Sequence, residues 1–205
     1  MLKPATLPFR FAKRMPMSEQ TSRQPPGDLA MWFFICAELL VFGAFFIAYA
    51  FARAKNIELF NSSQLTLNRT AGLINTAVLI TGSYFVVRAV IAIRQNLSSL
   101  CARWLWAAFG SGVVFVAIKI VEFGEKLSAG ISLSSNTFYM FYLSLTFFHF
   151  LHVILGMVIL AAVALKAGKG GYCSTDYSGV ETGASYWHMV DLVWIVLFPL
   201  VYVLH

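Results

Sequence analysis

Long apolar runs dominate the chain, and five of them are long enough to cross a bilayer as helices. A membrane-spanning helix needs about 20 predominantly apolar residues. The backbone of such a run satisfies its own polar groups only in a helix or a closed barrel, and these lengths fit helices. The pattern therefore predicts an all-α membrane protein, a bundle of five transmembrane helices over Leu29–Phe51, Ala71–Ile93, Trp104–Val121, Thr137–Leu165 and Tyr186–Leu204.

The first 28 residues differ from the rest. They hold five prolines and five basic residues and contain no long apolar run, which argues against a secretory signal. We expect a flexible cytoplasmic tail over 1–28 and a five-helix domain over 29–205, with Met15 or Met17 as alternative starts. Asp28 and Asn68 are expected to cap the first two spans. Pro199 lies inside the last span, which requires neighbours to satisfy the carbonyl that it frees.

Composition agrees with a membrane class and charge indicates an orientation. Hydrophobic residues make up 59% of the chain and charged residues 12%, whereas soluble domains carry about 25% charged residues. The net charge of +6 comes with no nucleic-acid-binding motif. Ten basic residues fall in the tail and the second and fourth loops, and five in the first and third. Because basic residues concentrate on cytoplasmic loops, we expect a multi-pass inner (plasma) membrane protein with a cytoplasmic N-terminus and His205 outside.

Ionisable residues inside the spans are candidates for function because burying them in lipid is costly. Glu38 lies about ten residues into the first span, roughly 15 Å along a helix and near mid-bilayer. One interpretation is a protonated carboxyl that hydrogen-bonds a neighbouring helix. The other is a proton-exchange or lipid-contact site. At the end of the third span, Lys119 and Glu122 are interpreted as a helix-end ion pair, and Trp187 as part of an interfacial aromatic belt.

Two histidine motifs raise the question of a metal or haem. His149 and His152 share one helix face, as do His188 and Asp191, where a carboxylate could orient the imidazole. His188 is expected at the very start of its span, whereas His152 lies about thirteen residues, roughly 20 Å, from the end of the preceding one. That difference in depth argues against one shared iron. We therefore expect no metal here, and histidines that hydrogen-bond between helices or to lipid head groups.

Five segments together resemble subunit III of the haem–copper oxidases, the cytochrome c oxidase subunit III family. The most specific part is H-x-x-H-V-x-x-G at 149–156, followed by Y-W-H-x-V-D-x-x-W at 186–194. The similarity covers most of residues 27–205. The segments are GDLAMWFFICAELLVFGAFF (27–46), LINTAVLITGSYFVVRAV (73–90), IKIVEF (118–123), FYLSLTFFHFLHVILG (141–156) and ETGASYWHMVDLVWIVLF (181–198).

The chain departs from the usual family pattern in having five spans instead of seven. It is similar to short five-helix members, including those associated with nitric oxide reductase operons. In seven-helix members phospholipid lies in a cleft beside the first two helices, so the resemblance leaves phospholipid as a candidate ligand here. It also implies lipid-contact, subunit-contact or proton-related roles for Glu38, His149, His152, Trp187, His188, Asp191 and Trp194.

The resemblance implies a non-catalytic accessory subunit with no catalytic residue and no cofactor of its own. Haem and copper are expected in a subunit I-like partner, which this chain would stabilise while supporting proton uptake in aerobic electron transport. An accessory subunit of nitric oxide reductase is the first alternative, and a stand-alone bis-histidine haem protein the second. A transporter is disfavoured, because five spans cannot divide into the inverted repeats common in that class.

Overall fold

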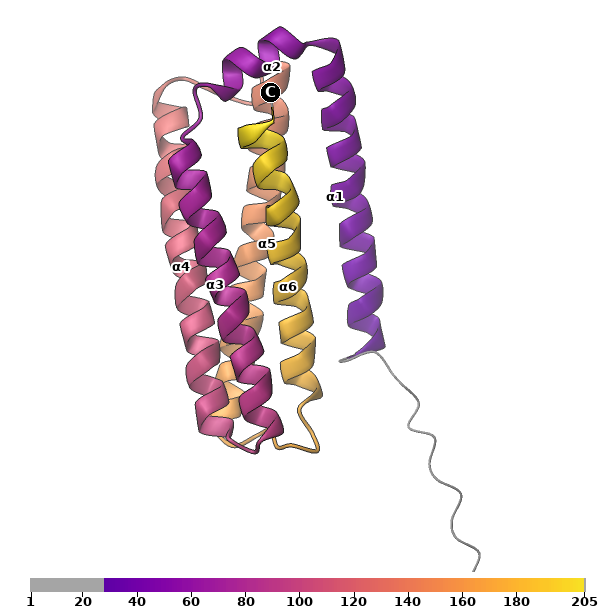
Figure 1. Cartoon of the computed structure of the whole chain (residues 1–205), viewed down its shortest axis with the longest axis vertical. Coiled ribbons are helices and arrows are strands. Elements are labelled where there is room, and N and C mark those ends of the chain that lie inside the picture. The colour runs from indigo at the N-terminus through magenta and orange to yellow at the C-terminus, as the bar shows by residue number, and fades with distance from the viewer. Residues whose placement is uncertain (1–27, 205) are drawn as a thin grey trace, which may run out of the picture.

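The structure of the chain, a computed structural model, describes residues 28–204, and its elements in that range are helices (Figure 1). The flexible tail predicted over 1–28 and the C-terminal His205 fall almost wholly outside the described residues. The elements are α1 (Leu29–Lys55), α2 (Ile57–Gln64), α3 (Arg69–Arg94), α4 (Ser98–Ser128), α5 (Thr137–Gly168), α6 (Ser178–Phe198) and the π-helical turn η1 (Pro199–Val203).

Five helices are long and apolar enough to cross a membrane: α1, α3, α4, α5, and α6 together with η1. They confirm the predicted all-α bundle of five spans. All five helices extend beyond the predicted spans, and the difference is largest for α4, which covers Ser98–Ser128, and for α6, which begins at Ser178. Hydropathy marks only the part of a helix that lies in hydrocarbon, whereas backbone hydrogen bonding continues the helix into the head-group region.

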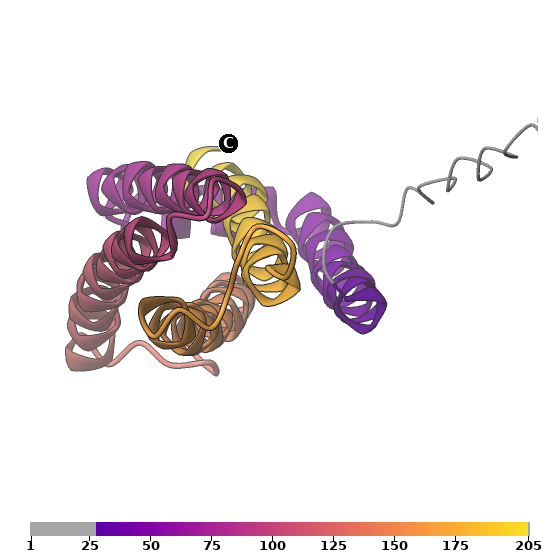
Figure 2. The same ribbon diagram turned by 90° about the horizontal axis from the view of Figure 1, so that it is seen from below.

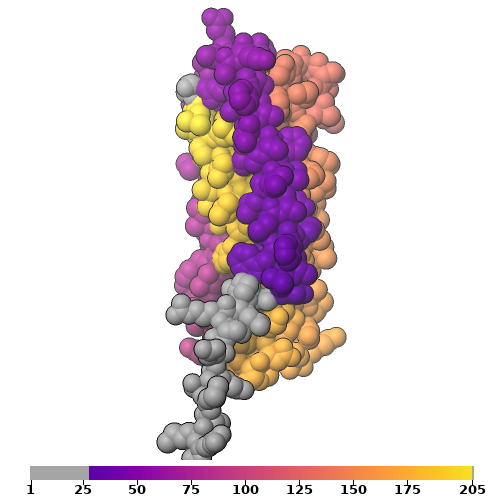
Figure 3. Space-filling view, turned by 90° about the vertical axis from the view of Figure 1, so that its right-hand side faces the viewer, coloured from indigo at the N-terminus to yellow at the C-terminus, as the bar shows by residue number. Residues whose placement is uncertain are grey.

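Helices α3, α4, α5 and α6 pack in a ring around a common core, and α1 packs on the outside against α6 and α5 (Figure 2). Helix α1 buries Ile35, Phe42 and Tyr49, and most of its other side chains face outward. In the space-filling view α1 forms one outer surface of the molecule, beside the C-terminal part of the chain (Figure 3). One long face of α1 is therefore left to lipid or to another chain.

Polar side chains shape the helix ends as expected. The Asp28 carboxylate accepts a hydrogen bond from the backbone amide of Ala30 at 3.1 Å, and the side-chain Oδ1 of Asn68 accepts one from the backbone amide of Ala71 at 3.0 Å. Both contacts satisfy amides that a helix start leaves without partners.

The short helix α2 lies across the end of the bundle where the chain also ends (Figure 1). From this helix Gln64 Nε2 donates to the carbonyl of Val201 at 2.9 Å, and Arg53 of α1 donates to the carbonyl of Leu204. Pro199 supplies no N–H to the terminal turn. Donors from α1 and α2 instead bond carbonyls at the very end of the last span, which a helix end leaves without intrahelical partners.

Trp187 lies at the centre of the ring, among glycines of the three other helices. A Cβ added at Gly82 of α3, Gly112 of α4 or Gly156 of α5 would lie 3.1–3.2 Å from the Trp187 ring. Glycine thus permits the close approach of all four helices around one indole. The aromatic-belt interpretation of Trp187 is wrong, because the side chain is fully buried.

We expect Gly156→Val to destabilise the bundle by about 1–3 kcal/mol, the usual cost of overpacking a filled core. The first added carbon already lies 3.2 Å from Trp187 and 3.3 Å from Tyr186. Gly110→Val is the matched control, since it changes a glycine within α4 that has nothing within 4 Å of its Cβ position. Thermal denaturation in one detergent measures both. Equal melting temperatures for the two variants would contradict the view that glycines are needed for the helices to pack closely around Trp187.

Candidate functional site

The structure brings Glu38 of α1 and His152 of α5 together. Glu38 Oε2 lies 3.0 Å from His152 Nε2, and His152 Nδ1 lies 2.8 Å from the carbonyl oxygen of Phe148. A carbonyl only accepts, so Nδ1 carries a proton and Nε2 faces the carboxyl group. The contact then holds a single proton, either on Glu38 or on His152. The pair joins α1 to the bundle and is partly exposed along that seam.

His149 lies one turn away in a different environment. It is fully buried, stacks on Trp194 at 5.2 Å between ring centroids, and meets the edges of Phe115 and Phe42. Neither ring nitrogen has a hydrogen-bond partner among the described residues. His149 and His152 therefore share a helix face without converging on one point, and residues 28–204 contain no group of three or more His, Cys, Asp and Glu side chains suited to a metal.

His188 and Asp191, the second motif, likewise contact different groups. Asp191 Oδ2 accepts a hydrogen bond at 2.8 Å from Ser83 Oγ of α3, and no hydrogen bond joins it to His188 within the described chain. The carboxylate therefore ties α6 to α3 instead of orienting the imidazole. His188 is partly buried and lines a groove between the same two helices.

The expected depth of His188 was wrong. Because α6 begins at Ser178, His188 lies about ten residues, or roughly 15 Å, inside the helix instead of at its start. His152 lies about 24 Å from the end of α5 by the same rise, so the difference in depth is smaller than the sequence indicated. The imidazoles of His152 and His188 nevertheless lie at different helix contacts, since His152 contacts α1 and His188 faces α3.

Trp194 connects the core to a buried ion pair. Its Nε1 donates to Thr76 Oγ1 of α3 at 2.9 Å, and Lys119 Nζ of α4 lies 4.9 Å from its ring centroid. An ammonium group over an indole face is a favourable cation–π contact. One face of the core thus combines a stacked imidazole, an indole and a cation.

Sequence reasoning missed that Lys119 and Glu122 form the centre of a buried polar cluster. Their side chains are 0% and 3% exposed, and Lys119 Nζ lies 2.8 Å from Glu122 Oε2. Lys119 also donates to the Tyr202 hydroxyl at 2.7 Å. The hydroxyls of Tyr142 and Tyr202 each donate to Glu122 Oε1 at 2.7 Å. The cluster therefore joins α4, α5 and the end of the last span.

The interpretation of this pair as a helix-end contact is corrected for a simple reason. The predicted third span stopped at Val121, but α4 continues to Ser128 and carries the pair inside the bundle. A lysine and a glutamate three residues apart, beside an apolar run, were the only signal in the sequence. Their tyrosine partners come from distant segments, which spacing does not reveal.

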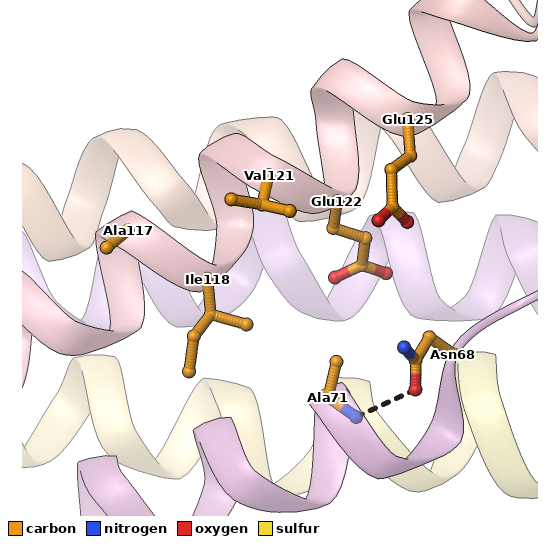
Figure 4. Close-up of a pocket in the computed structure, with 7 residues that line it drawn as sticks. All are labelled: Asn68, Ala71, Ala117, Ile118, Val121, Glu122 and Glu125. Carbon is orange, nitrogen blue, oxygen red and sulfur yellow. Dashed lines mark hydrogen bonds between the residues drawn. The ribbon is translucent and has the colours of Figure 1, made fainter.

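A cavity of about 290 Å³ opens beside this cluster, between the start of α3 and the last turns of α4 (Figure 4). The carboxylates of Glu122 and Glu125 lie on one side of it, and Asn68 and Ala71 on the other. Glu122 therefore both lines the cavity and bonds Lys119.

Comparison with known proteins identifies the family. A family model described as cytochrome c oxidase subunit III matches residues 24–205. This chain belongs to the cytochrome c oxidase subunit III family. It is 30% identical to the cytochrome c oxidase subunit 3 of Thermostichus vulcanus, over 86% of each chain. It is 33% identical to that of Synechocystis sp., over 86% of this chain and 76% of the relative.

A third relative is a larger protein. The heme-copper oxidase subunit I+III of Aeropyrum pernix is 31% identical over 84% of this chain, which spans 22% of that relative. Subunit III is a non-catalytic accessory subunit of haem–copper oxidase complexes, and the expected accessory role is thereby confirmed. The Glu38–His152 contact and the buried Lys119–Glu122 cluster are accordingly features of an accessory subunit.

The buried ion pair of this subunit III predicts strongly non-additive mutations. Lys119→Met or Glu122→Gln alone should each destabilise the protein by about 3–5 kcal/mol when the remaining partner stays charged, because it is then an uncompensated buried charge. The double variant should be more stable than the sum of the two losses predicts. Unfolding of wild type and the three variants in one detergent gives this double-mutant cycle. Simple additivity would show that the two side chains do not act as a pair.

Proposed function

We propose that this chain packs in the plasma membrane against a subunit I-like chain that holds haem and copper. Three observations support this partner. The chain belongs to the subunit III family, and the Aeropyrum pernix relative is named as subunits I and III together. The exposed long face of α1 offers a surface for another membrane chain. The chain stabilises this partner and supports its proton uptake during aerobic electron transport.

Glu38 and His152 support the partner from the seam between α1 and the bundle. Their contact satisfies a carboxyl group that would otherwise lie unpaired in lipid. It also fixes how far α1 is rotated relative to α5. We assign a structural role to this pair, in which it keeps α1 in place against α5. The proton is shared between Glu38 and His152 and is not passed on to another group.

Phospholipid is part of the same proposal. A largely apolar groove of about 530 Å³ lies on the side formed by α1, α4 and α5, and it suits an acyl chain. A lipid there would fill the space beside α1. The groove is lined by Phe45, Phe123, Leu127, Leu133, Leu143, Ser144, Phe147, Phe148 and Leu151.

The orientation proposed from loop charge places the start of α1 on the cytoplasmic side and the end of η1 outside. It rests on the excess of basic residues in the tail and in the second and fourth loops.

No observation favours nitric oxide reductase as the complex. The relatives reported above are named as oxidase subunits. The aligned region covers the same share of this chain and of the Thermostichus vulcanus protein, so the two have similar lengths. A short chain is therefore compatible with a cytochrome c oxidase, and membership of a nitric-oxide-reductase branch does not follow from length.

The partnership is tested by isolating the chain from native membranes in mild detergent. We expect a larger multi-span haem protein in stoichiometric amount, identified by mass spectrometry and by its visible spectrum with and without carbon monoxide. The activity of the complex with oxygen and with nitric oxide then distinguishes the two kinds of reductase. Recovery of the chain alone, while the oxidase elutes separately, would contradict the proposal.

A substitution at Glu38 tests the supporting role. In Glu38→Gln the amide still donates to His152 Nε2, so we expect initial turnover within about twofold of wild type. Activity should fall faster over repeated turnovers, since Gln cannot form the charge-assisted hydrogen bond that Glu38 makes when the proton lies on His152, and so holds α1 less firmly. Oxygen consumption at equal amounts of assembled complex, across a pH series, measures both. Collapse of the initial rate at every pH with intact assembly would make Glu38 a participant in proton transfer.

A further inference from the structure

The groove between α3 and α6 combines features that nothing above explains. It has a volume of about 250 Å³ and lies between the last turns of α3 and the first turns of α6. Both helix ends are at the end of the bundle where α1 begins (Figure 1). Its lining residues are Val87, Val90, Ile91, Arg94, Glu181, Ala184, Ser185 and His188.

The mouth of this groove carries one charge of each sign. Arg94 ends α3, and its NH2 nitrogen lies 2.9 Å from Glu181 Oε1 in the first turn of α6. The Arg94 side chain remains 55% exposed. A guanidinium has five N–H donors and a carboxylate two oxygens, so both groups keep bonding capacity after they pair. The mouth is therefore neutral overall but able to bind a cation and an anion that are held close together.

Deeper in the groove, two polar side chains have no hydrogen-bond partner within residues 28–204. They are Ser185 and His188, which are partly buried between the two helices. Both side chains line the groove, so a ligand in it can reach them. His188 lies seven residues beyond Glu181, about 10 Å along the helix. The Ser185 hydroxyl and the His188 imidazole thus lie deeper in the groove than the Arg94–Glu181 pair and can donate hydrogen bonds there.

The remaining wall of the groove is apolar and continuous with the surface that faces the membrane. Val87 and Ile91 are 44% and 46% exposed on the outward side of α3. Val87 lies about 10 Å from Arg94 along the helix, at the same depth range as His188. A ligand in the groove therefore meets charges at the membrane interface, hydroxyl and imidazole groups below them, and an apolar wall along its length.

We propose that this groove binds a zwitterionic phospholipid with a primary ammonium head group, of the phosphatidylethanolamine class. The phosphate accepts hydrogen bonds from Arg94, and the ammonium group donates to Glu181. Ser185 and His188 donate to the ester carbonyls of the lipid, and an acyl chain follows Val87. An anionic lipid without an ammonium group would leave the mouth with one net negative charge, because Arg94 alone cannot offset both the phosphate and the Glu181 carboxylate.

This site is separate from the apolar groove beside α1, because it lies on α3 and α6 and selects a head group. It also does not depend on which subunit the chain accompanies. A bilayer supplies the ligand directly from the membrane phase, so no further protein is needed to deliver it.

The test uses the complex purified in mild detergent and then washed in the same detergent. Retained phospholipids are quantified by mass spectrometry per mole of this chain. We expect wild type to retain an ethanolamine phospholipid that Arg94→Gln and Val87→Trp lose, the second by filling the groove without changing a charge. Arg103→Gln and Val114→Trp are the matched controls, since both alter exposed side chains of α4 away from the groove. Both should retain the lipid.

A second arm measures selectivity. The washed complex is incubated with dioleoylphosphatidylethanolamine or dioleoylphosphatidylglycerol before a further wash. Wild type should rebind the first and not the second, and Glu181→Gln should lose this preference. Equal retention by all variants, or equal rebinding of both lipids by wild type, would overturn the proposal. The haem spectrum of the same samples reports separately whether the partner subunit is present.

Discussion

Lipid offers no hydrogen bonds, so a polar side chain inside this bundle can be satisfied only by a partner within the protein. The consequence is visible in how the helices are joined. Asp191 bonds Ser83, Trp194 bonds Thr76, and Glu38 contacts His152. Each contact links two spans. Apolar side chains between helices gain little by associating when lipid tails surround them, so close packing and these few polar contacts determine which helix faces meet.

The last span carries most of this organisation. One face of α6 presents Trp187 to the glycines, Asp191 to α3 and Trp194 to the imidazole of His149. The face ends at Tyr202, which joins the Lys119 cluster. These positions follow the three- and four-residue spacing of one helix face. The span is accordingly the most buried of the five, whereas α1 is the least buried.

The sequence predicted the number and approximate place of the spans, because a run of apolar residues is a property of one segment. It did not predict partners, because a partner depends on the rotation of two helices about their axes. His188 and Asp191 have the spacing of a histidine oriented by a carboxylate, yet Asp191 bonds Ser83. Lys119 and Glu122 were visible as a pair, but their burial depends on Tyr142 and Tyr202. Glu38 and His152 could be singled out separately, and only the fold brings them together.

The distribution of satisfied and unsatisfied groups matches an accessory subunit. The buried Lys119–Glu122 pair is bonded within the bundle and needs nothing from outside it. At the edges of the bundle, side chains are left without partners in the described part of the chain. Helix α1 leaves most of its apolar face uncovered, and His188 and Ser185 open into a groove whose other side is the membrane. A chain whose central ion pair is bonded internally, and whose edges stay open, is suited to hold its shape while protein on one side and lipid on another cover those edges.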